Sequence, residues 1–363
     1  MDISDIYMSR CLELATHGKG SVAPNPMVGA VIVADGVIIG EGFHRCYGEA
    51  HAEVNAIASV KDKALLRRST MYVNLEPCSH YGKTPSCAEL IIRQAIPRVV
   101  IACLDPNPKV AGRGIKMLHE AGVAVTTGVR EQEAAMLNRF FMTAHLRHRP
   151  YIILKCAQSE DGFIDGNRKE KSDKPVVFSN AITRMMAHQL RSEVQAIMVG
   201  TNTAVLDNPA LTVRAWTGKS PVRILVDRNL RVPQGYRLLD GKHQTFVFTI
   251  KSDILLKKRE NIRYYLLDES DFKVSEIASI LFKNDVHSLL VEGGALLHRS
   301  FIEENLWDEL IVETAPIQLK EGVRSAFSMV SDSFQITDRQ CIYSGIPGLD
   351  MPSLMERYFN YTF

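Results

Sequence analysis

Apolar residues follow two regular patterns along the first part of the chain. Short runs rich in β-branched residues alternate with stretches that carry apolar residues at helical spacing, and Gly or Pro separates them. The expected helices cover residues 6–17, 51–60, 87–95, 115–121 and 131–146, and the expected strands cover 28–33, 37–42, 70–75, 98–103 and 123–127. Asp35-Gly36 predicts a hairpin between the first two strands. Alternating strands and helices predict a layered α/β domain.

A second α/β set begins after His148-Arg149-Pro150, which is typical of a linker because the residue before a proline disfavours helix. The expected strands cover residues 151–157, 196–200, 222–227, 245–249, 262–267, 288–292 and 309–314, and the expected helices cover 181–193, 274–283 and 295–304. A chain of 363 residues is long enough for two domains. The predicted domains span residues 1–147 and 150–363.

Composition narrows the possible partners. The formal net charge is only +2, so no strong basic field favours nucleic acid or an anionic membrane. No apolar run reaches the roughly 18 residues of a membrane span, and the N-terminus lacks a signal-peptide pattern. Seven cysteines in a chain of this size favour buried, metal-bound or catalytic thiols over disulfides, so we expect a cytoplasmic protein.

One group of residues has the composition of a catalytic zinc site. His51 opens a predicted helix, Cys78 follows a predicted strand, and Cys87 opens another helix. Imidazole and thiolate are zinc ligands, and three protein ligands leave a fourth position for water. Glu53, two residues from His51, is placed to move protons without binding the metal. We therefore expect one Zn²⁺ per chain, with a structural zinc site as the alternative.

The H-x-E and Pro-Cys elements resemble the signature of zinc-dependent nucleobase deaminases, although the second cysteine follows Cys78 by nine positions instead of three. Three longer motifs, APNPMVGAVIV at 23–33, GFHRCYGEAHAE at 42–53 and EPCSHYGKTPSC at 76–87, are more specific. They resemble the deaminase half of the bifunctional riboflavin-biosynthesis family, in which a diaminohydroxyphosphoribosylaminopyrimidine deaminase is joined to a 5-amino-6-(5-phosphoribosylamino)uracil reductase. The resemblance extends over nearly the whole chain.

For the first half, this resemblance implies a cytidine-deaminase-like three-layer domain that binds a small phosphorylated pyrimidine. It assigns the metal to His51, Cys78 and Cys87 and the proton shuttle to Glu53. The implied substrate-binding residues are Asn25, His44, His80, Lys83 and Thr84. The family usually has Pro where this chain has Ser86, a minor departure beside the ligand Cys87.

In the second half of the chain, the residues alone indicate a ligand site less strongly than the zinc motif does in the first half. Gly293-Gly294 lies between a predicted strand and helix, where backbone N–H groups can approach a phosphate. The GxGxxG dinucleotide fingerprint is absent, and such a turn also occurs as a plain connection. The polar segment at 165–174 is either a mobile surface loop or a lid over the substrate.

The resemblance implies a dihydrofolate-reductase-like fold for this half and NADPH as its cofactor. The residues that would contact NADPH are Ala157, Thr203, Asp207, Gly294, Ala295 and Leu296, with the segment continuing to Ser300. The residues that would contact substrate are Arg191, Leu211, Arg214 and Glu292. Arg228 is the candidate for the 2′-phosphate of NADPH. Many relatives have Ser-x-Trp-Ile-Thr where this chain has residues 175–179, PVVFS, so we expect the Trp stacking contact to be missing.

These observations predict two consecutive activities: hydrolytic deamination of 2,5-diamino-6-(5-phosphoribosylamino)pyrimidin-4(3H)-one, then NADPH reduction of the ribosyl group to give 5-amino-6-(5-phosphoribitylamino)uracil. Lys155 and Asp161 are candidate proton donors for the reduction, with structural hydrogen bonding as the alternative. Two other functions stay open, a nucleic-acid base deaminase and a deaminase with a non-catalytic C-terminal assembly domain. We expect no nucleic-acid or membrane partner, and the sequence leaves a homo-oligomer possible.

Overall fold

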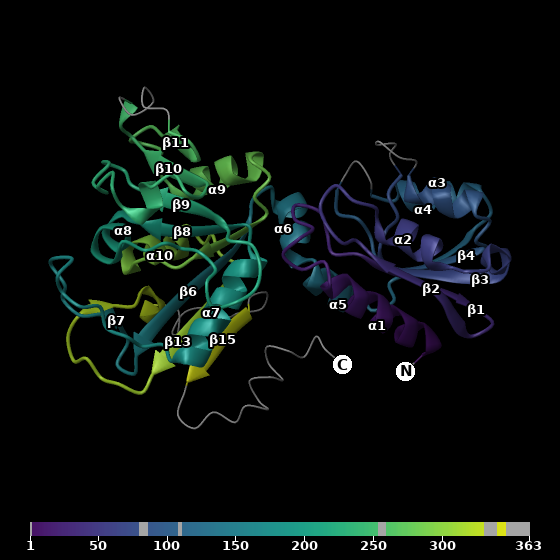
Figure 1. Cartoon of the computed structure of the whole chain (residues 1–363), viewed down its shortest axis with the longest axis horizontal. Coiled ribbons are helices and arrows are strands. Elements are labelled where there is room, and N and C mark those ends of the chain that lie inside the picture. Colours follow the sequence, from purple (N-terminus) through teal and green to yellow (C-terminus); the bar gives the residue numbers. More distant parts are fainter. Residues whose placement is uncertain (1, 80–85, 108–110, 253–258, 330–339, 346–363) are drawn as a thin grey trace. The chain divides into compact units, whose positions relative to one another are not determined.

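The computed structural model describes residues 2–79, 86–107, 111–252, 259–329 and 340–345. The chain forms two compact units, and the boundary between them lies between His148 and Arg149. Each unit is built around its own sheet (Figure 1). Within the described ranges, no helix has the length and apolar character needed to cross a membrane.

The N-terminal unit has a five-stranded mixed sheet with the order β2-β1-β3-β4-β5. Its strands are β1 (Gly29–Ala34), β2 (Val37–Phe43), β3 (Ser69–Leu75), β4 (Arg98–Cys103) and β5 (Ala124–Thr127). β1 is antiparallel to β2 and β3, whereas β3, β4 and β5 are parallel. Asp35 and Gly36 both have positive φ, of 51° and 77°, as a two-residue hairpin turn requires. The hairpin predicted from Asp35-Gly36 is therefore present.

Helices cover both faces of this sheet (Figure 1). They are α1 (Ile3–Thr16), α2 (Ala52–Ser59), α3 (Cys87–Arg93), α4 (Arg113–Glu120), α5 (Glu131–Leu137) and α6 (Arg139–Arg147), with a 3-10 helix at Lys63–Arg68. Alternate residues of β1 enter different cores: Ile32 packs with α2, α3 and α4, whereas Val31 packs with α1, α5 and α6. The result is the expected three-layer α/β/α domain, in which each buried aliphatic side chain contributes about 1.5–3 kcal/mol.

One expected helix is wrong in its extent. A single helix was predicted over 131–146, but the helix is interrupted at Asn138, where φ is −98° and ψ is 22°. The Asn138 Oδ1 accepts a hydrogen bond from the Met27 N–H at 2.8 Å, and its Nδ2 donates to the Met27 carbonyl at 2.9 Å. Long-range bonding of the carboxamide thus accompanies a break that the local apolar spacing does not reveal.

The C-terminal unit has an eight-stranded sheet with the order β11-β10-β9-β8-β12-β6-β13-β15, and all neighbouring pairs are parallel. Its strands are β6 (Tyr151–Ser159), β8 (Ala196–Gly200), β9 (Val222–Val226), β10 (Thr245–Thr249), β11 (Ile262–Leu266), β12 (Ser288–Val291), β13 (Glu309–Ala315) and β15 (Gln340–Gly345). Because the strands are parallel, their carboxyl ends share one edge of the sheet, where ligands of open α/β folds bind.

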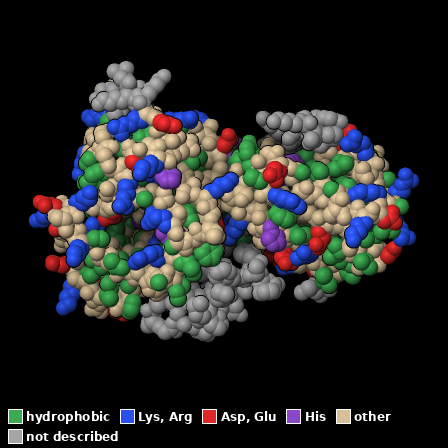
Figure 2. Space-filling view, in the orientation of Figure 1, with side chains coloured by type: hydrophobic (Ala, Val, Ile, Leu, Met, Phe, Trp, Pro, Cys, Tyr) green, Lys and Arg blue, Asp and Glu red, His purple; other side chains and the backbone are tan. Residues whose placement is uncertain are grey.

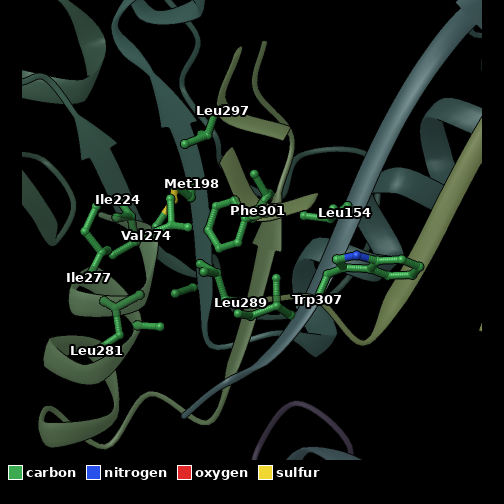
Figure 3. Close-up of a cluster of buried hydrophobic side chains, with 14 of the residues drawn as sticks. Leu154, Met198, Ile224, Val274, Ile277, Leu281, Leu289, Leu297, Phe301 and Trp307 are labelled. Carbon is green, nitrogen blue, oxygen red and sulfur yellow. The ribbon is translucent and has the colours of Figure 1, made fainter. Parts of the chain in front are cut away.

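The helices of this unit are α7 (Ala181–Glu193), α8 (Thr201–Asp207), α9 (Val274–Lys283) and α10 (Ala295–Glu303), with 3-10 helices at Arg237–Leu239 and Ala326–Met329. A two-stranded ribbon pairs β7 (Phe163–Asp165) with β14 (Val323–Arg324). The core combines strand residues such as Leu154 and Leu289 with Ile277 of α9 and Phe301 of α10 (Figure 3). The structure adds α8, β7, β14 and β15 to the elements expected from the sequence.

Candidate functional site: a His-Cys-Cys cluster and a parallel-sheet edge

Three side chains from separate elements form a candidate metal centre in the N-terminal unit. His51 is the N-cap of α2, Cys78 follows β3, and Cys87 is the first residue of α3. Their ligand atoms all lie within 4.8 Å of one another, with the His51 Nδ1 3.3 Å from the Cys87 Sγ and 3.7 Å from the Cys78 Sγ. Zinc bond lengths of about 2.0 Å to nitrogen and 2.3 Å to sulfur require a tetrahedral N–S separation of about 3.5 Å. These residues therefore fit a zinc ion.

The pKa values of this cluster place one thiolate, at Cys78. Hydrogen bonding with Cys87, assisted by His51, lowers the pKa of the Cys78 thiol to about 4 despite its burial. The bond with Cys78 raises the pKa of Cys87, and hydrogen bonding to Cys78 raises the pKa of His51 to about 9. A zinc ion bound here would displace the protons of His51 and Cys87, because neutral imidazole and thiolate are the forms that bind metals.

Glu53 lies in the first turn of α2 and is only 3% exposed. Burial raises its pKa, and the nearby charge of Cys78 raises it further. A buried carboxyl group whose pKa is raised is suited to accept a proton and return it. This environment suits the proton shuttle that the sequence assigns to Glu53.

Ser86 has a clear local role. Its Oγ accepts a hydrogen bond from the Glu89 N–H at 3.2 Å, so Ser86 caps the helix that begins at Cys87. An N-cap of this type stabilises a helix by about 1 kcal/mol. The departure from the proline usual in the family therefore preserves a well-defined start for α3.

Asn25 and His44, two of the expected substrate residues, are hydrogen-bonded to each other. The His44 Nδ1 lies 3.1 Å from the carbonyl of Ala50, which can only accept, so Nδ1 carries the hydrogen. The His44 Nε2 then accepts from the Asn25 Nδ2 at 3.2 Å. Burial lowers the pKa of His44, which favours this neutral ring. The other expected substrate residues of this unit, His80, Lys83 and Thr84, lie outside the described residues.

The segment that carries Asn25 is held by residues that the sequence analysis missed. Besides Asn138, the buried Asn74 of β3 donates to the Met27 carbonyl at 3.0 Å and accepts from the Gly29 N–H at 2.8 Å. Both carboxamides are therefore bound to backbone two to four residues after Asn25. An asparagine within a helical pattern was the available signal for Asn138, because asparagine competes for backbone hydrogen bonds.

In the C-terminal unit, the expected substrate residues meet just beyond the sheet edge. Arg191 of α7 and Glu292, which follows β12, form a two-bond ion pair, with Nε–Oε1 at 2.9 Å and Nη2–Oε2 at 2.6 Å. Arg191 also donates to the Thr212 carbonyl at 3.4 Å, and Arg214 donates to the Thr212 Oγ1 at 3.0 Å. The neighbouring Leu211 has a φ of 52°, in the left-handed region. Arg191, Arg214, Leu211 and Glu292 are thus brought together as expected.

The expected cofactor residues lie on α8 and at the start of α10. Gly294 has a φ of 62°, and a Cβ added there would lie 3.2 Å from the Oγ1 of Thr203. A Cβ at Gly293 would lie 2.7 Å from the Cα of Val199, so both positions of this turn need glycine. Ala295 and Leu296 open α10, and Leu296 is 67% exposed.

Other expected cofactor residues have protein partners. Asp207, at the end of α8, accepts from Arg168 at 2.6 Å, which ties the polar 165–174 loop to this helix. Arg228 pairs with Glu269 at 2.8 Å and lies over the Phe272 ring. Ala157 of β6 is paired in register with Glu313 of β13.

Asp161 and Lys155 are the two candidate proton donors for the reduction. Hydrogen bonds from Ser159 and from the backbone of residues 319 and 320 lower the pKa of Asp161 to about 2, so Asp161 is ionised and is not a proton donor near neutral pH. Lys155 lies 3.9 Å from Glu313, which also accepts a hydrogen bond from Ser179 at 2.7 Å.

The 175–179 stretch, where the stacking Trp was expected to be missing, carries Val177, which is 65% exposed. Ser179 therefore binds Glu313 in the stretch where relatives carry Ser-x-Trp.

Comparisons with known proteins agree with this arrangement. Residues 1–103 match the family described as the cytidine and deoxycytidylate deaminase zinc-binding region, and residues 150–341 match the RibD C-terminal domain. The riboflavin biosynthesis protein RibD of Bacillus amyloliquefaciens is 44% identical, over 92% of this chain and 90% of that protein. The Escherichia coli RibD protein is 36% identical, over 88% of this chain and 89% of that protein.

Solved structures show the same similarity over both units. The diaminohydroxyphosphoribosylaminopyrimidine deaminase/5-amino-6-(5-phosphoribosylamino)uracil reductase of Thermotoga maritima has a TM-score of 0.82 and 36% identity, covering 91% of each chain. Acinetobacter baumannii RibD in form 1 has a TM-score of 0.81 and 33% identity, covering 92% of each chain. The fold and the site thus define a zinc-dependent deaminase joined to an NADPH-dependent reductase. The chain belongs to the RibD family of riboflavin-biosynthesis enzymes.

Proposed function

We propose that this chain deaminates 2,5-diamino-6-(5-phosphoribosylamino)pyrimidin-4(3H)-one and then reduces the ribosyl group of the product to give 5-amino-6-(5-phosphoribitylamino)uracil. The observation that carries the first step is the cluster of His51, Cys78 and Cys87 beside the buried Glu53. Family membership, with matches in both halves of the chain, supports the second step and disfavours a non-catalytic C-terminal half.

For the deamination, we assign the metal to His51, Cys78 and Cys87. A zinc ion bound there would lower the pKa of a coordinated water toward neutrality. Glu53 moves both protons of the attacking water: the first passes to the ring nitrogen, and the second, from the added hydroxyl group, passes to the amine that leaves as ammonia. Asn25 and His44 contact the pyrimidine, and the hydrogen bond that the His44 Nδ1 donates to the Ala50 carbonyl sets which ring nitrogen of His44 is protonated.

For the reduction, bound NADPH would supply the hydride to C1′ of the ribosyl group, while the bond from C1′ to the ring oxygen breaks and that oxygen takes a proton from solvent. We assign NADPH binding to the sheet edge that carries Thr203, Asp207 and the α10 start at Gly294–Leu296, with Ala157 on β6. Leu211, Arg214 and Glu292 contact the substrate, and Arg191 orients Glu292 through their two hydrogen bonds. The parallel strands that end at this edge support the assignment.

A nucleic-acid substrate is disfavoured by the surface. On the face shown in Figure 2, Lys and Arg side chains are interspersed with acidic and apolar ones. A nucleic-acid groove usually combines gathered basic residues with exposed aromatic ones. We also propose a cytoplasmic location, because none of the six cysteines with described side chains is in a disulfide bond.

Glu53→Gln tests the proposed deamination. The amide keeps the shape of the side chain but cannot shuttle a proton, so we expect deamination to fall by about 10²- to 10⁴-fold, toward the upper end, with zinc retained. Reduction of the deaminated intermediate should be unchanged. Glu49→Gln is the matched control, because Glu49 is exposed and lies two residues before His51. Normal deamination by Glu53→Gln, or loss of its zinc in a folded protein, would contradict the assigned role.

A further inference from the structure

Glu76 is a buried carboxylate two residues before the candidate ligand Cys78, and none of the roles assigned above involves it. It is 4% exposed. Its Oε2 accepts hydrogen bonds from the N–H groups of Asp105 at 3.3 Å and Gly112 at 3.0 Å. Its Oε1 accepts from Gly114 at 3.0 Å and Ile115 at 3.4 Å. One side chain thus binds four backbone N–H groups of the segment that enters and starts α4.

The contact between α4 and the Glu76–Cys78 segment is also close at the backbone. A Cβ added at Gly114 would lie 2.0 Å from the carbonyl oxygen of Pro77, the residue between Glu76 and Cys78. Such a distance is far shorter than van der Waals contact, so only glycine fits at this point. The first turn of α4 therefore packs directly on the peptide that leads into Cys78.

Cys78 is held from its other side by α3. The Ala88 N–H donates to the Cys78 carbonyl at 3.1 Å, and the Cys87 N–H donates to the Cys78 Sγ at 3.3 Å. The residues from Glu76 to Cys78 thus lie between two helix starts. Glu76 binds the start of α4, and the first residue of α3 donates a hydrogen bond to the Cys78 sulfur.

We propose that Glu76 is a positioning residue for the metal centre: by binding the start of α4, it places the Cys78 thiolate and slows loss of the metal. This inference rests on the proposed zinc site. The dipole of α4 and the four N–H donors stabilise an anion at Glu76 and would not stabilise an amide in the same way. A residue that orients a metal ligand without binding the metal typically changes metal affinity by about 10- to 100-fold.

Glu76→Gln provides the main test. One end of the glutamine amide is a donor, so it would face backbone N–H groups and leave them without an acceptor. We expect the variant to release zinc to a chelator about 10 to 100 times faster than the parent chain. In the cobalt-loaded form, the thiolate-to-cobalt absorption should also shift, because the Cys78 sulfur moves. Glu76→Asp keeps the charge and should restore part of the slow release.

Glu120→Gln is the matched control, because Glu120 lies at the other end of α4, where it forms an exposed pair with Lys116 at 3.8 Å. Its zinc release and cobalt spectrum should equal those of the parent chain. A folded Glu76→Gln protein with unchanged zinc release and cobalt spectrum would overturn the inference while the proposed function stands. If the parent chain itself bound no zinc, the proposed function would fail and the inference with it.

Hydrogen exchange in the parent chain tests the same coupling if Glu76→Gln does not fold. When zinc is removed by a chelator, the N–H groups of Gly112 and Gly114 should exchange faster, because the Glu76–Cys78 segment is no longer anchored at Cys78. The N–H groups of Val99 and Ile101, in the middle of β4, are the control and should change little. Equal protection of Gly112 and Gly114 with and without zinc would overturn the inference.

Discussion

Arg191 and Glu292 form a two-bond ion pair although 101 residues separate them in the sequence. Their side chains are 14% and 12% exposed. Burial by itself raises the pKa of Glu292, but the charge and hydrogen bonds of Arg191 outweigh burial, and the pKa is lowered. Since the Nε–Nη2 edge of the Arg191 guanidinium binds Glu292 and its Nη1 donates to the Thr212 carbonyl, Arg214 is the better candidate for the substrate phosphate, and Arg191 is expected to hold Glu292 in place.

Replacing Arg191 by Met should destabilise the C-terminal unit and impair the reduction. Removing one partner of a buried pair costs roughly 3–5 kcal/mol in the free energy of unfolding, because the other charge stays buried. Glu292 would no longer be held in place for the substrate. We expect the reductase kcat/KM to fall by roughly 10- to 150-fold, which corresponds to losing a charge-assisted hydrogen bond of about 1.5–3 kcal/mol. Deamination should be nearly unchanged. Equal damage to both reactions in a folded protein would favour a single shared cleft.

The stability lost in Arg191→Met should depend on pH in a direction that the pKa of Glu292 sets. In the parent chain the folded-state pKa of Glu292 is lowered, so its stabilisation is present above the unfolded pKa of about 4.3 and is lost as the pH falls through the folded pKa. Without Arg191, only the charges of Lys155 and His188 oppose burial, so the pKa of Glu292 should rise from its lowered value and protonation at acid pH should relieve the penalty. Urea unfolding should therefore show a stability difference that is largest near neutral pH and shrinks toward acid pH. Arg184→Met, at an exposed position of α7, should show a small difference at every pH.

Cys87→Ala should reduce the zinc content from about one equivalent per chain to a small fraction, because two ligands hold zinc far less well than three. Metal analysis of purified protein measures this directly. Cys103→Ala is a suitable control: Cys103 is another buried thiol of the same unit, and burial raises its pKa to about 12, so it is not a thiolate. Full zinc occupancy in Cys87→Ala would remove Cys87 from the ligand set.

Asn138→Ala should weaken substrate binding in the deamination step. It removes two hydrogen bonds to Met27 and takes the acceptor from the part-buried Met27 N–H, at a cost of about 1–3 kcal/mol in the free energy of unfolding, while Asn74 still donates to the Met27 carbonyl. Because Asn25 lies two residues away, we expect the KM for the pyrimidine to rise more than kcat falls, with zinc content unchanged. The reductase reaction of the same variant is the internal control. A fall in kcat alone, at constant KM, would show that Asn138 does not position the substrate segment.

Arg228→Ala should reduce a preference for NADPH over NADH. Arg228 follows β9, and its partner Glu269 is 75% exposed, so this pair is weak enough to exchange for a phosphate. We expect the KM for NADPH to rise about tenfold or more, with the KM for NADH unchanged, since only NADPH carries the 2′-phosphate. Arg231→Ala is the matched control, because Arg231 lies three residues further on and donates to Asn202 instead. Parallel effects of the two substitutions would assign the change to general surface charge.

The sequence alone was sufficient for most elements and for the candidate metal ligands. Strands such as Arg98–Cys103 and helices such as Val274–Lys283 have the bounds that their apolar spacing predicts, because that spacing reports which face of each element is buried. The H-x-E and Pro-Cys elements are short enough for their residue types and spacing to indicate zinc chemistry directly. Seven-residue α8 was missed, since a helix of two turns carries too few apolar positions to show a period.

Only the tertiary structure decided which polar side chains meet. The bonds of Asn138 to Met27 span 111 residues, those of Arg191 to Glu292 span 101, and those of Glu76 to the start of α4 span up to 39. A local pattern carries no information about such partners, because each contact exists only once the sheet has brought distant segments together. A single polar residue at the right position is enough to make the contact, and it leaves no periodic signal in the sequence. The sequence thus determined the elements and the kind of chemistry, and the fold determined which residues support that chemistry.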